Sequence, residues 1–337
     1  MLSQLLGYSR SAFQIRRVIT TVFVLFAFAL VPAAAGSLTH SGNHTGFIDH
    51  GGKRRTYLLH TPRVFDGHPL PLIVVLHGGM GTARTARRMS GMDAKADKEG
   101  FFVVYPNGDG PFPPFLQTWN AGGCCGFSAS GQVDDVGFIR KLLQHLRETL
   151  PIDPSRIFVT GISNGGMMAN RIGCALSDVV AAVAPVAGCL YTQGCQPLSP
   201  VSVVAFNGTR DKAVLYNGGI GTTRIGYKVN CLSVSECIKF WVDHNHCRPQ
   251  VQREERGNII KETYGGGLNG TEVVVYTIKG GQHAWPGGKQ PFPFAQMPSR
   301  DISATDAMWD FFTHHPKTRP VTTATAAAIE IGTTEKP

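Results

Sequence analysis

The sequence is poor in charge and shows no internal repeat. Asp, Glu, Lys and Arg together make up 16% of its 337 residues, whereas hydrophobic residues make up 42%. A chain with this composition is not disordered, and it differs from coiled coils and collagens. The 40 glycines and 21 prolines follow no fixed period, which argues against a repeat array and indicates many turns.

The chain also lacks a cluster of basic residues and a typical metal-binding cysteine pattern. Lys and Arg outnumber Asp and Glu by 32 to 23, but the surplus is spread along the chain, so we expect no nucleic-acid partner. No C-x-x-C pair occurs, and the group of His244, His246 and Cys247 resembles a metal site only weakly. We therefore expect neither a metal nor a cofactor.

The one long hydrophobic run lies near the amino terminus. Val18–Val31 follows two arginines and precedes the small residues Ala33 and Ala35, as in a secretory signal. The alternative is an uncleaved membrane anchor, but a membrane-spanning helix needs about 20 apolar residues. We expect residues 1–35 to be removed, which leaves a secreted, extracellular protein with no membrane segment.

Cysteine usage agrees with export. An even number of cysteines favours disulfide bonds in an exported chain, although the sequence leaves their pairing open. The eight are Cys124, Cys125, Cys174, Cys189, Cys195, Cys231, Cys237 and Cys247. Three N-x-T tripeptides, at Asn43, Asn207 and Asn269, are acceptors for N-linked glycosylation. Asn207 ends an apolar run, so we expect it to be inaccessible.

Short apolar runs alternate with segments of helical periodicity. We expect strands or buried runs at 51–62, 70–76, 101–105, 156–160, 181–185, 201–206 and 271–278. The first of these should be an edge strand. We expect one helix that ends near Gly100, one over 134–150 and one from 164 to about 176. Two more should begin after Ser233 and after Ser303. The alternation predicts one α/β domain over 36–315 with a mainly parallel sheet, followed by a disordered tail over 316–337.

Residues 161–166, GISNGG, match the G-x-S-x-G pattern of a nucleophile elbow. In this motif a serine sits on a sharp turn between a strand and a helix, and the glycines let the two elements approach closely. The surrounding residues fit, because RIFVT precedes the motif and GMMANRIG follows it. We expect Ser163 to be a nucleophile; the alternative is an ordinary glycine-rich turn.

A serine hydroxyl needs a base, and the base needs an acid that orients it. In proteins with this elbow the chain order is serine, acid, histidine. His283 lies in a glycine-rich loop directly after a strand, and Asp211 directly follows another strand. We therefore expect Asp211 as the acid and His283 as the base. The alternatives are a turn carboxylate paired with a basic neighbour and a surface-loop histidine.

Two backbone N–H groups should stabilise the oxyanion that forms during acyl transfer. One belongs to Asn164, the residue after the proposed nucleophile, and the other to the loop after an early strand. In that loop we expect Gly79 to be the donor, with Met80 as the alternative. His77 is expected to brace the loop through a side-chain hydrogen bond.

Two tryptophans and one pair of adjacent aspartates are open to two interpretations each. Trp119 and Trp285 either line a substrate cleft or pack in the core. Asp134 and Asp135 could form a paired-carboxylate site, but we favour a helix cap at this position.

Several segments, in this order, resemble those of one family. They are LHGGMGTA, FFVVYPNG, WNAGGCCG, VDDVGFI, GISNGGMMANRI, APVAG, the GT-x-D segment with YNGG, and GGQHAWPGG. Over about residues 45–315 the chain resembles secreted polyhydroxybutyrate depolymerase-like and feruloyl esterase-like α/β-hydrolases of carbohydrate esterase family 1. The resemblance implies an α/β-hydrolase fold, the triad Ser163, Asp211 and His283, and a disulfide at Cys124 and Cys125. Where the family usually has V-P-Y after the acid, this chain has Val214, Leu215 and Tyr216.

The sequence therefore predicts a secreted, monomeric serine esterase without a cofactor. Its substrate would be a feruloylated plant cell-wall polysaccharide or a polyhydroxybutyrate-type ester. Alternatives are an acetylxylan-type esterase, a peptidase or lipase on the same scaffold, and a non-catalytic binding module. The absence of a long apolar lid segment argues against a lipase.

Overall fold

The computed structural model describes residues 40–113, 115–223, 226–293 and 295–318. The expected signal peptide (1–35) lies outside these residues, as does the expected tail from residue 319 onward.

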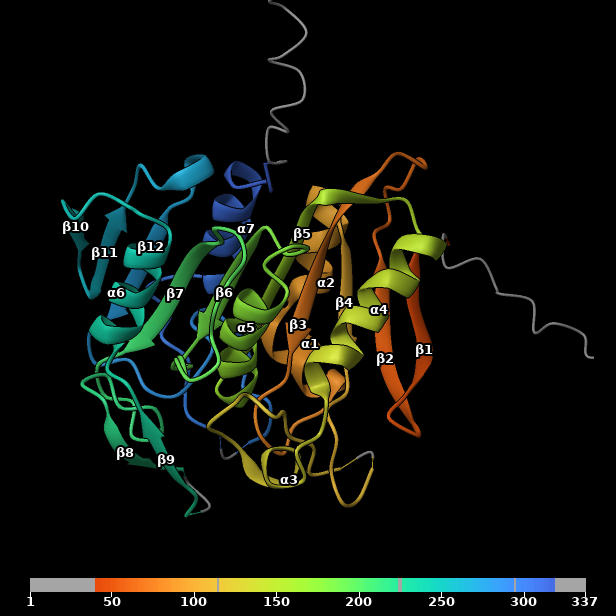
Figure 1. Ribbon diagram of the computed structural model, residues 1–337, viewed down its shortest axis with the longest axis horizontal. Helices are drawn as coiled ribbons and strands as arrows, with labels where there is room; N and C mark the ends of the chain where they lie inside the picture. Colours follow the sequence, from red (N-terminus) through yellow and green to blue (C-terminus); the bar gives the residue numbers. More distant parts are fainter. Residues whose placement is uncertain (1–39, 114, 224–225, 294, 319–337) are drawn as a thin grey trace, which may run out of the picture. The chain divides into compact units, whose positions relative to one another are not determined.

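In the described residues, ten strands form one sheet (Figure 1). From one edge to the other they are β1 (Gly42–His50), β2 (Lys53–Thr61), β4 (Phe102–Pro106), β3 (Leu70–Leu76), β5 (Ile152–Ile162), β6 (Ala182–Val186), β7 (Ser202–Gly208), β12 (Val273–Ile278), β11 (Ile259–Tyr264) and β10 (Gln252–Arg256). The strands from β4 to β12 in this order are parallel, and the two outer strands on each side are antiparallel. This arrangement confirms the predicted α/β fold with a mainly parallel sheet.

The parallel strands are apolar because both faces of the sheet are covered. In β3, Leu72, Val74 and Leu76 point into one core, whereas Ile73 and Val75 point into the other. All five side chains are fully buried. A strand buried on both faces reads as a continuous run of branched apolar residues, which is the pattern from which it was predicted.

Helices cover both faces of the sheet. Those in front in Figure 1 are α4 (Asp135–Thr149), α5 (Asn164–Ala175) and α6 (Val234–His244). Those behind are α1 (Ala83–Ser90), α2 (Met92–Glu99) and α7 (Ala304–His314). The predicted caps are confirmed: Asp134 caps α4, Ser233 forms a capping box with Glu236 at α6, and Ser303 caps α7.

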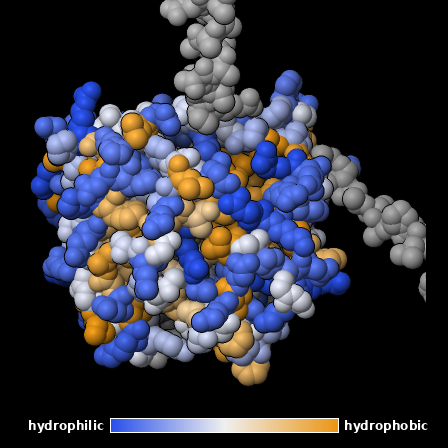
Figure 2. All heavy atoms as spheres, in the orientation of Figure 1, coloured by the Kyte–Doolittle hydropathy of each residue, from blue (hydrophilic) through white to orange (hydrophobic). Residues whose placement is uncertain are grey.

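The smaller elements lie in connections. The loop after β4 contains α3 (Gly126–Ser130), and the connection after β7 contains the hairpin of β8 (Gly219–Thr222) and β9 (Lys228–Cys231). A short 3₁₀ turn, Leu268–Gly270, precedes β12. Figure 2 shows hydrophobic side chains scattered among hydrophilic ones on the face viewed in Figure 1, as is normal for a protein surface.

Two expectations about local structure were wrong. The strand at 51–62 is not an edge strand, because β1 pairs along its full length, from Gly42 opposite Thr61 to His50 opposite Lys53. The single helix expected before Gly100 is two helices. Gly91, in the left-handed conformation at φ 62°, ends α1 and begins α2, so the chain changes direction there.

Candidate active site

Ser163 lies at the turn between β5 and α5, in a conformation that residues with a side chain rarely adopt. Its φ is 57° and its ψ is −124°. The neighbouring glycines are required by contacts: a Cβ on Gly161 would lie 2.5 Å from the Gly165 carbonyl oxygen, and one on Gly165 would lie 2.4 Å from the His77 carbonyl oxygen. The predicted strand–turn–helix context is therefore present, with the strain typical of functional turns.

Asp211 and His283 form a hydrogen-bonded pair. The Asp211 Oδ2 lies 2.7 Å from His283 Nδ1, and Oδ1 accepts the backbone N–H groups of Ala213 (2.8 Å) and Val214 (2.9 Å). The Asp211 side chain is almost completely buried, whereas that of His283 is 20% exposed. Since a carboxylate only accepts, Nδ1 carries the proton and Nε2 is left as a proton acceptor.

The loops that carry this pair touch through glycine. A Cβ on Gly208 would lie 2.4 Å from the Gly281 carbonyl oxygen, and the Arg210 N–H donates to that oxygen at 2.8 Å. Without a side chain at position 208, the loop after β7 and the loop after β12 can approach closely enough for Asp211 to reach His283.

Ser163, Asp211 and His283 follow the ends of three parallel strands, β5, β7 and β12. Carboxyl ends of parallel strands meet at one edge of a sheet, where ligands bind in open α/β sheets. The structure joins Asp211 to His283. In the described residues no hydrogen bond joins the Ser163 hydroxyl to His283, although such contacts are often long in unliganded enzymes.

The loop after β3 lies against the elbow. A Cβ on Gly79 would lie 3.8 Å from the Asn164 Cβ, and one on Gly78 would lie 3.5 Å from the Ser163 Cβ. The two predicted oxyanion donors are thus neighbours. Met80 is the weaker alternative, because its N–H already donates to the Gln117 carbonyl at 2.7 Å.

His77 braces this loop, as predicted. It is fully buried; its Nε2 accepts the Gly108 N–H at 2.9 Å, which leaves Nδ1 to donate to the Gly78 carbonyl at 2.8 Å. Burial lowers the pKa of His77 to about 4, so the ring is neutral near pH 7. A neutral ring with both nitrogens bonded is a structural support rather than a base.

Neither of the two predicted cleft tryptophans faces a cleft in the described structure. Trp119 is 0% exposed and Trp285 is 1% exposed, so the packing interpretation replaces the cleft interpretation for both. The Trp285 indole N–H donates to Thr305 Oγ1 at 3.0 Å and so ties the loop of His283 to α7. The indole of Trp119 donates to the His77 carbonyl at 2.9 Å.

The sequence did not indicate a buried ion pair between β2 and the start of α4. Arg55 donates to Asp135 at 2.6 Å, and both side chains are almost fully buried. The other Asp135 oxygen accepts the Asn120 N–H at 2.8 Å, and Arg171 donates to the Asn120 side chain at 2.7 Å. Burial raises the pKa of Asp135, against the opposing effect of Arg55. The adjacent Asp134 caps α4, so the two acids are not a paired-carboxylate site.

The cysteines are largely paired. Cys174 pairs with Cys195 and Cys189 with Cys231, at Cα–Cα distances of 5.1 and 5.8 Å, and Cys124 pairs with its neighbour Cys125. Cys237 and Cys247 are free and buried.

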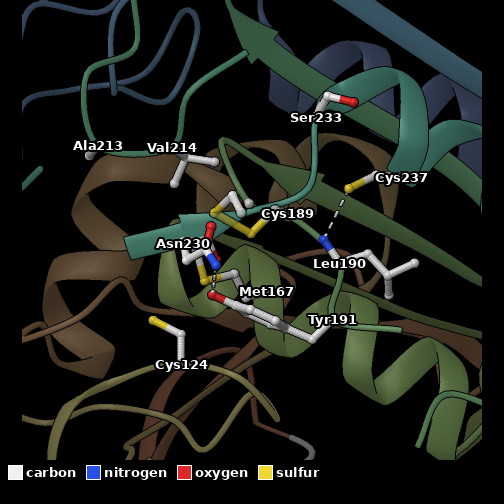
Figure 3. The surroundings of a disulfide bond; sticks show 12 residues. Cys124, Met167, Cys189, Leu190, Tyr191, Ala213, Val214, Asn230, Ser233 and Cys237 are labelled. Atoms are coloured by element: carbon white, nitrogen blue, oxygen red, sulfur yellow. Dashed lines mark hydrogen bonds between the residues drawn. A yellow bond between two sulfur atoms is a disulfide. The ribbon is translucent and has the colours of Figure 1, made fainter. Parts of the chain in front are cut away.

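The disulfide between Cys189 and Cys231 holds the β8–β9 hairpin to the segment after β6. Figure 3 shows Cys189 with Tyr191 directed toward Asn230 and Cys237 directed toward Leu190. The Tyr191 hydroxyl donates to the Asn230 carbonyl at 2.9 Å, and the Leu190 N–H donates to the Cys237 sulfur at 3.2 Å. A covalent bond and a hydrogen bond thus fasten β9.

The remaining features concern metals, membranes and modification. Within the described ranges, no group of three or more His, Cys, Asp or Glu side chains is arranged to hold a metal ion. Over the same ranges, the helices are too short or too polar to cross a membrane. Of the glycosylation acceptors, Asn43 and Asn269 are exposed, whereas Asn207 is 8% exposed, as expected for an inaccessible site.

Comparison with known proteins identifies the family. The chain matches the family described as Esterase PHB depolymerase over residues 55–223, half of its length. It is 33% identical to feruloyl esterase B of Piromyces equi over 249 residues, which cover 72% of this chain and 45% of that protein. It is 30% identical to putative esterase NocK of Nocardia uniformis subsp. tsuyamanensis over 281 residues, 77% of this chain and 79% of that protein.

The fold has a counterpart among solved structures. The acetyl xylan esterase from Aspergillus awamori superposes with a TM-score of 0.57 at 15% identity, over 80% of this chain and 99% of that one. At this identity the similarity concerns the α/β-hydrolase fold alone. The chain belongs to the esterase PHB depolymerase family, which confirms the resemblance seen in the sequence. It spans less than half of the Piromyces enzyme.

Proposed function

We propose that this chain is a serine esterase that hydrolyses carboxylic esters through an acyl-enzyme. The observation that carries the proposal is the buried Asp211 bonded to His283, at the same sheet edge as the strained Ser163 elbow. Membership of an esterase family supports it, as does the position of Gly79 beside Asn164.

The mechanism follows from the proton positions. Asp211 holds the proton on His283 Nδ1, so Nε2 can take the proton of the Ser163 hydroxyl as its oxygen attacks the ester carbonyl. The N–H groups of Gly79 and Asn164 would stabilise the oxyanion. Collapse expels the alcohol, which receives the proton from His283. Water, activated by the same histidine, then releases the acid and restores Ser163.

The side chains beside the proposed oxyanion loop favour an ester with an apolar or aromatic acid. Met80 and Leu116 are exposed, and the Met80 N–H bonds to the residue after Leu116. Phe112 and Phe115 lie with Leu116 in the loop after β4, where their backbones form a β-bridge; they are 66% and 68% exposed. Exposed apolar side chains that neighbour one another, unlike singly scattered ones, are a frequent sign of a binding surface. We propose a feruloylated polysaccharide or a hydroxybutyrate-type polyester as the substrate.

A paired assay tests the substrate. Purified protein is given methyl ferulate in one reaction and polyhydroxybutyrate with a soluble hydroxybutyrate oligomer in the other. Release of ferulate alone identifies a plant cell-wall esterase, and release of hydroxybutyrate alone identifies a depolymerase or oligomer hydrolase. Cleavage of p-nitrophenyl acetate without either would direct attention to acetylated sugars.

A second assay tests the triad. Fluorophosphonate should label wild-type protein at Ser163, and His283→Ala and Asp211→Asn should lower turnover by several orders of magnitude while the protein stays folded. Folded wild-type protein that is neither labelled nor active would favour a binding module and refute the proposal.

We also propose that the protein is exported and acts outside the cell as a monomer. The signal-like amino terminus and the paired cysteines support export, because disulfide bonds persist in oxidising compartments. Detection of protein that begins at Gly36 in culture medium would test the signal cleavage, and light scattering would test the monomer.

A further inference from the structure

Trp119 makes three hydrogen bonds that join the elbow to the loop after β3. Its backbone N–H donates to Asn164 Oδ1 at 2.7 Å, and its carbonyl accepts from Asn164 Nδ2 at 3.0 Å. Its indole N–H donates to the His77 carbonyl at 2.9 Å. The residue is 0% exposed, so none of these bonds competes with bulk water.

The pairing with Asn164 holds the first residue of α5. A side-chain amide bonded to both groups of one peptide unit has little freedom to rotate. Asn164 is the first residue of α5 after the cap Ser163, so its own N–H has no partner within the helix. The pairing therefore fixes the orientation of a backbone donor that is left free to bind an oxyanion.

The same segment also holds the other donor loop at two points. Trp119 bonds to the carbonyl of His77, and Gln117 accepts the N–H of Met80 at 2.7 Å. Gly78 and Gly79 lie between these two anchors. The carbonyl of Gly78, in the same peptide group as the Gly79 N–H, accepts from His77 Nδ1 at 2.8 Å and from the Gly81 N–H at 3.0 Å. These bonds orient the Gly79 N–H within the loop, and the two anchors hold the loop against the segment that bonds to Asn164.

Asn120 holds the segment 117–120 through contacts of its own. Its N–H donates to Asp135, which is paired with Arg55, and Arg171 donates to its carbonyl at 2.6 Å. The segment 117–120 is thus bonded to the elbow, to the glycine loop and to a buried ion pair. This makes it the physical link between the two N–H groups of the proposed oxyanion hole.

We propose that Trp119 is a positioning residue that sets the separation of the Gly79 and Asn164 N–H donors. The inference rests on the proposed function and deepens it: the tryptophan acts through the two donors and does not touch the substrate. Loss of the indole N–H would let the glycine loop move relative to the elbow. Stabilisation of the tetrahedral state would then fall more than binding of the substrate.

The test variant is Trp119→Phe, which removes the indole donor and keeps the backbone pairing with Asn164. Removing an oxyanion donor costs about 10² to 10³ in kcat, so misplacing one should cost less, about 10 to 100-fold. We expect this loss in kcat for p-nitrophenyl acetate with KM nearly unchanged. We expect the same loss of affinity for a boronic acid, which forms a tetrahedral adduct with the serine.

The matched control is Trp241→Phe. Trp241 is equally buried and also loses one indole hydrogen bond, to Asn170 Oδ1 at 3.2 Å, but it lies on α6 outside this network. Both variants should lose some thermal stability, and only Trp119→Phe should lose kcat per fluorophosphonate-labelled site. Equal kcat values for the two variants would overturn the inference and leave the esterase proposal standing.

Asn164→Ala gives a second test if Trp119→Phe does not fold. It removes the pairing from the other side and keeps the backbone N–H, so kcat should fall while KM changes little. A change in KM alone would show that the network shapes the substrate site rather than the oxyanion site, and would overturn the inference. A wild-type protein with no turnover and no labelling would refute the proposed function, and the inference with it.

Discussion

The backbone of Ser163 is strained, and substitution can separate this strain from the chemistry. At φ 57° and ψ −124° a residue with a Cβ is disfavoured, whereas glycine adopts this region readily. We compare Ser163→Ala, which keeps the Cβ and removes the hydroxyl, with Ser163→Gly, which removes both. Both variants should be inactive on esters, and we expect only the glycine variant to be more stable than wild type.

The size of the difference follows from two opposing contributions. A residue held in such a conformation costs about 1 to 3 kcal/mol. Glycine costs about 0.4 to 1 kcal/mol through the greater freedom of the unfolded chain. In the described residues the Ser163 hydroxyl has no hydrogen bond to lose. Ser163→Gly should therefore exceed Ser163→Ala by about 1 to 2 kcal/mol in the free energy of unfolding.

The assay is equilibrium unfolding in urea, supported by calorimetry. For a chain of this size about 1 kcal/mol corresponds to roughly 2 to 4 °C in Tm, so the glycine variant should melt about 2 to 8 °C above the alanine variant. Equal or reversed Tm values would refute the argument that the elbow stores strain. Ester turnover that survives in either variant would move the nucleophile away from Ser163.

Three further predictions follow from contacts and titration. Because the pKa of His77 is lowered to about 4 from an ordinary value near 6.5, its contribution to stability is complete above pH 6.5 and is lost as pH falls toward 4. Between pH 7 and pH 4.5 the free energy of unfolding should fall by about 2 kcal/mol through this group, and the fall should be smaller in His77→Asn. In denaturant, thiol titration should detect two free thiols per chain, at Cys237 and Cys247, and almost none in the native state, since burial raises the pKa of both; eight free thiols would contradict the pairing. Gly161→Ala should destabilise by more than about 2 kcal/mol because its Cβ meets backbone at 2.5 Å, whereas Gly79→Ala, whose nearest neighbour is at 3.8 Å, should fold normally; similar Tm values would contradict the steric argument.

Local features of the sequence determined much of the fold. Branched apolar runs such as Leu70–Leu76 indicate buried strands because both faces of the sheet are covered. Capping residues such as Ser233 mark helix starts because they bond to N–H groups only three residues away. The position of β2 within the sheet was mispredicted, because pairing with β1 depends on a partner strand and not on the pattern of β2 itself.

In the candidate site, too, some features follow from local sequence and others only from tertiary structure. The sequence placed Ser163, Asp211 and His283 after strands, because the motif, the glycine-rich loop and the chain order are all local or sequential features. Tertiary structure alone decided that Asp211 contacts His283, 72 positions further along the chain. It also showed Trp119 and Trp285 to be buried, since the number of neighbours around a ring is not encoded in the residues beside it.

The remaining contacts depend on long-range packing. Arg55 and Asp135 are 80 positions apart, and no spacing rule connects them. The pairing of Cys189 with Cys231 depends on where β9 lies against the segment after β6, so the number of cysteines could not reveal it. Sequence by itself determined which residues are the candidates for the chemistry and which strands they follow. The tertiary structure decided which of them meet, because those contacts form only when distant segments pack around one sheet.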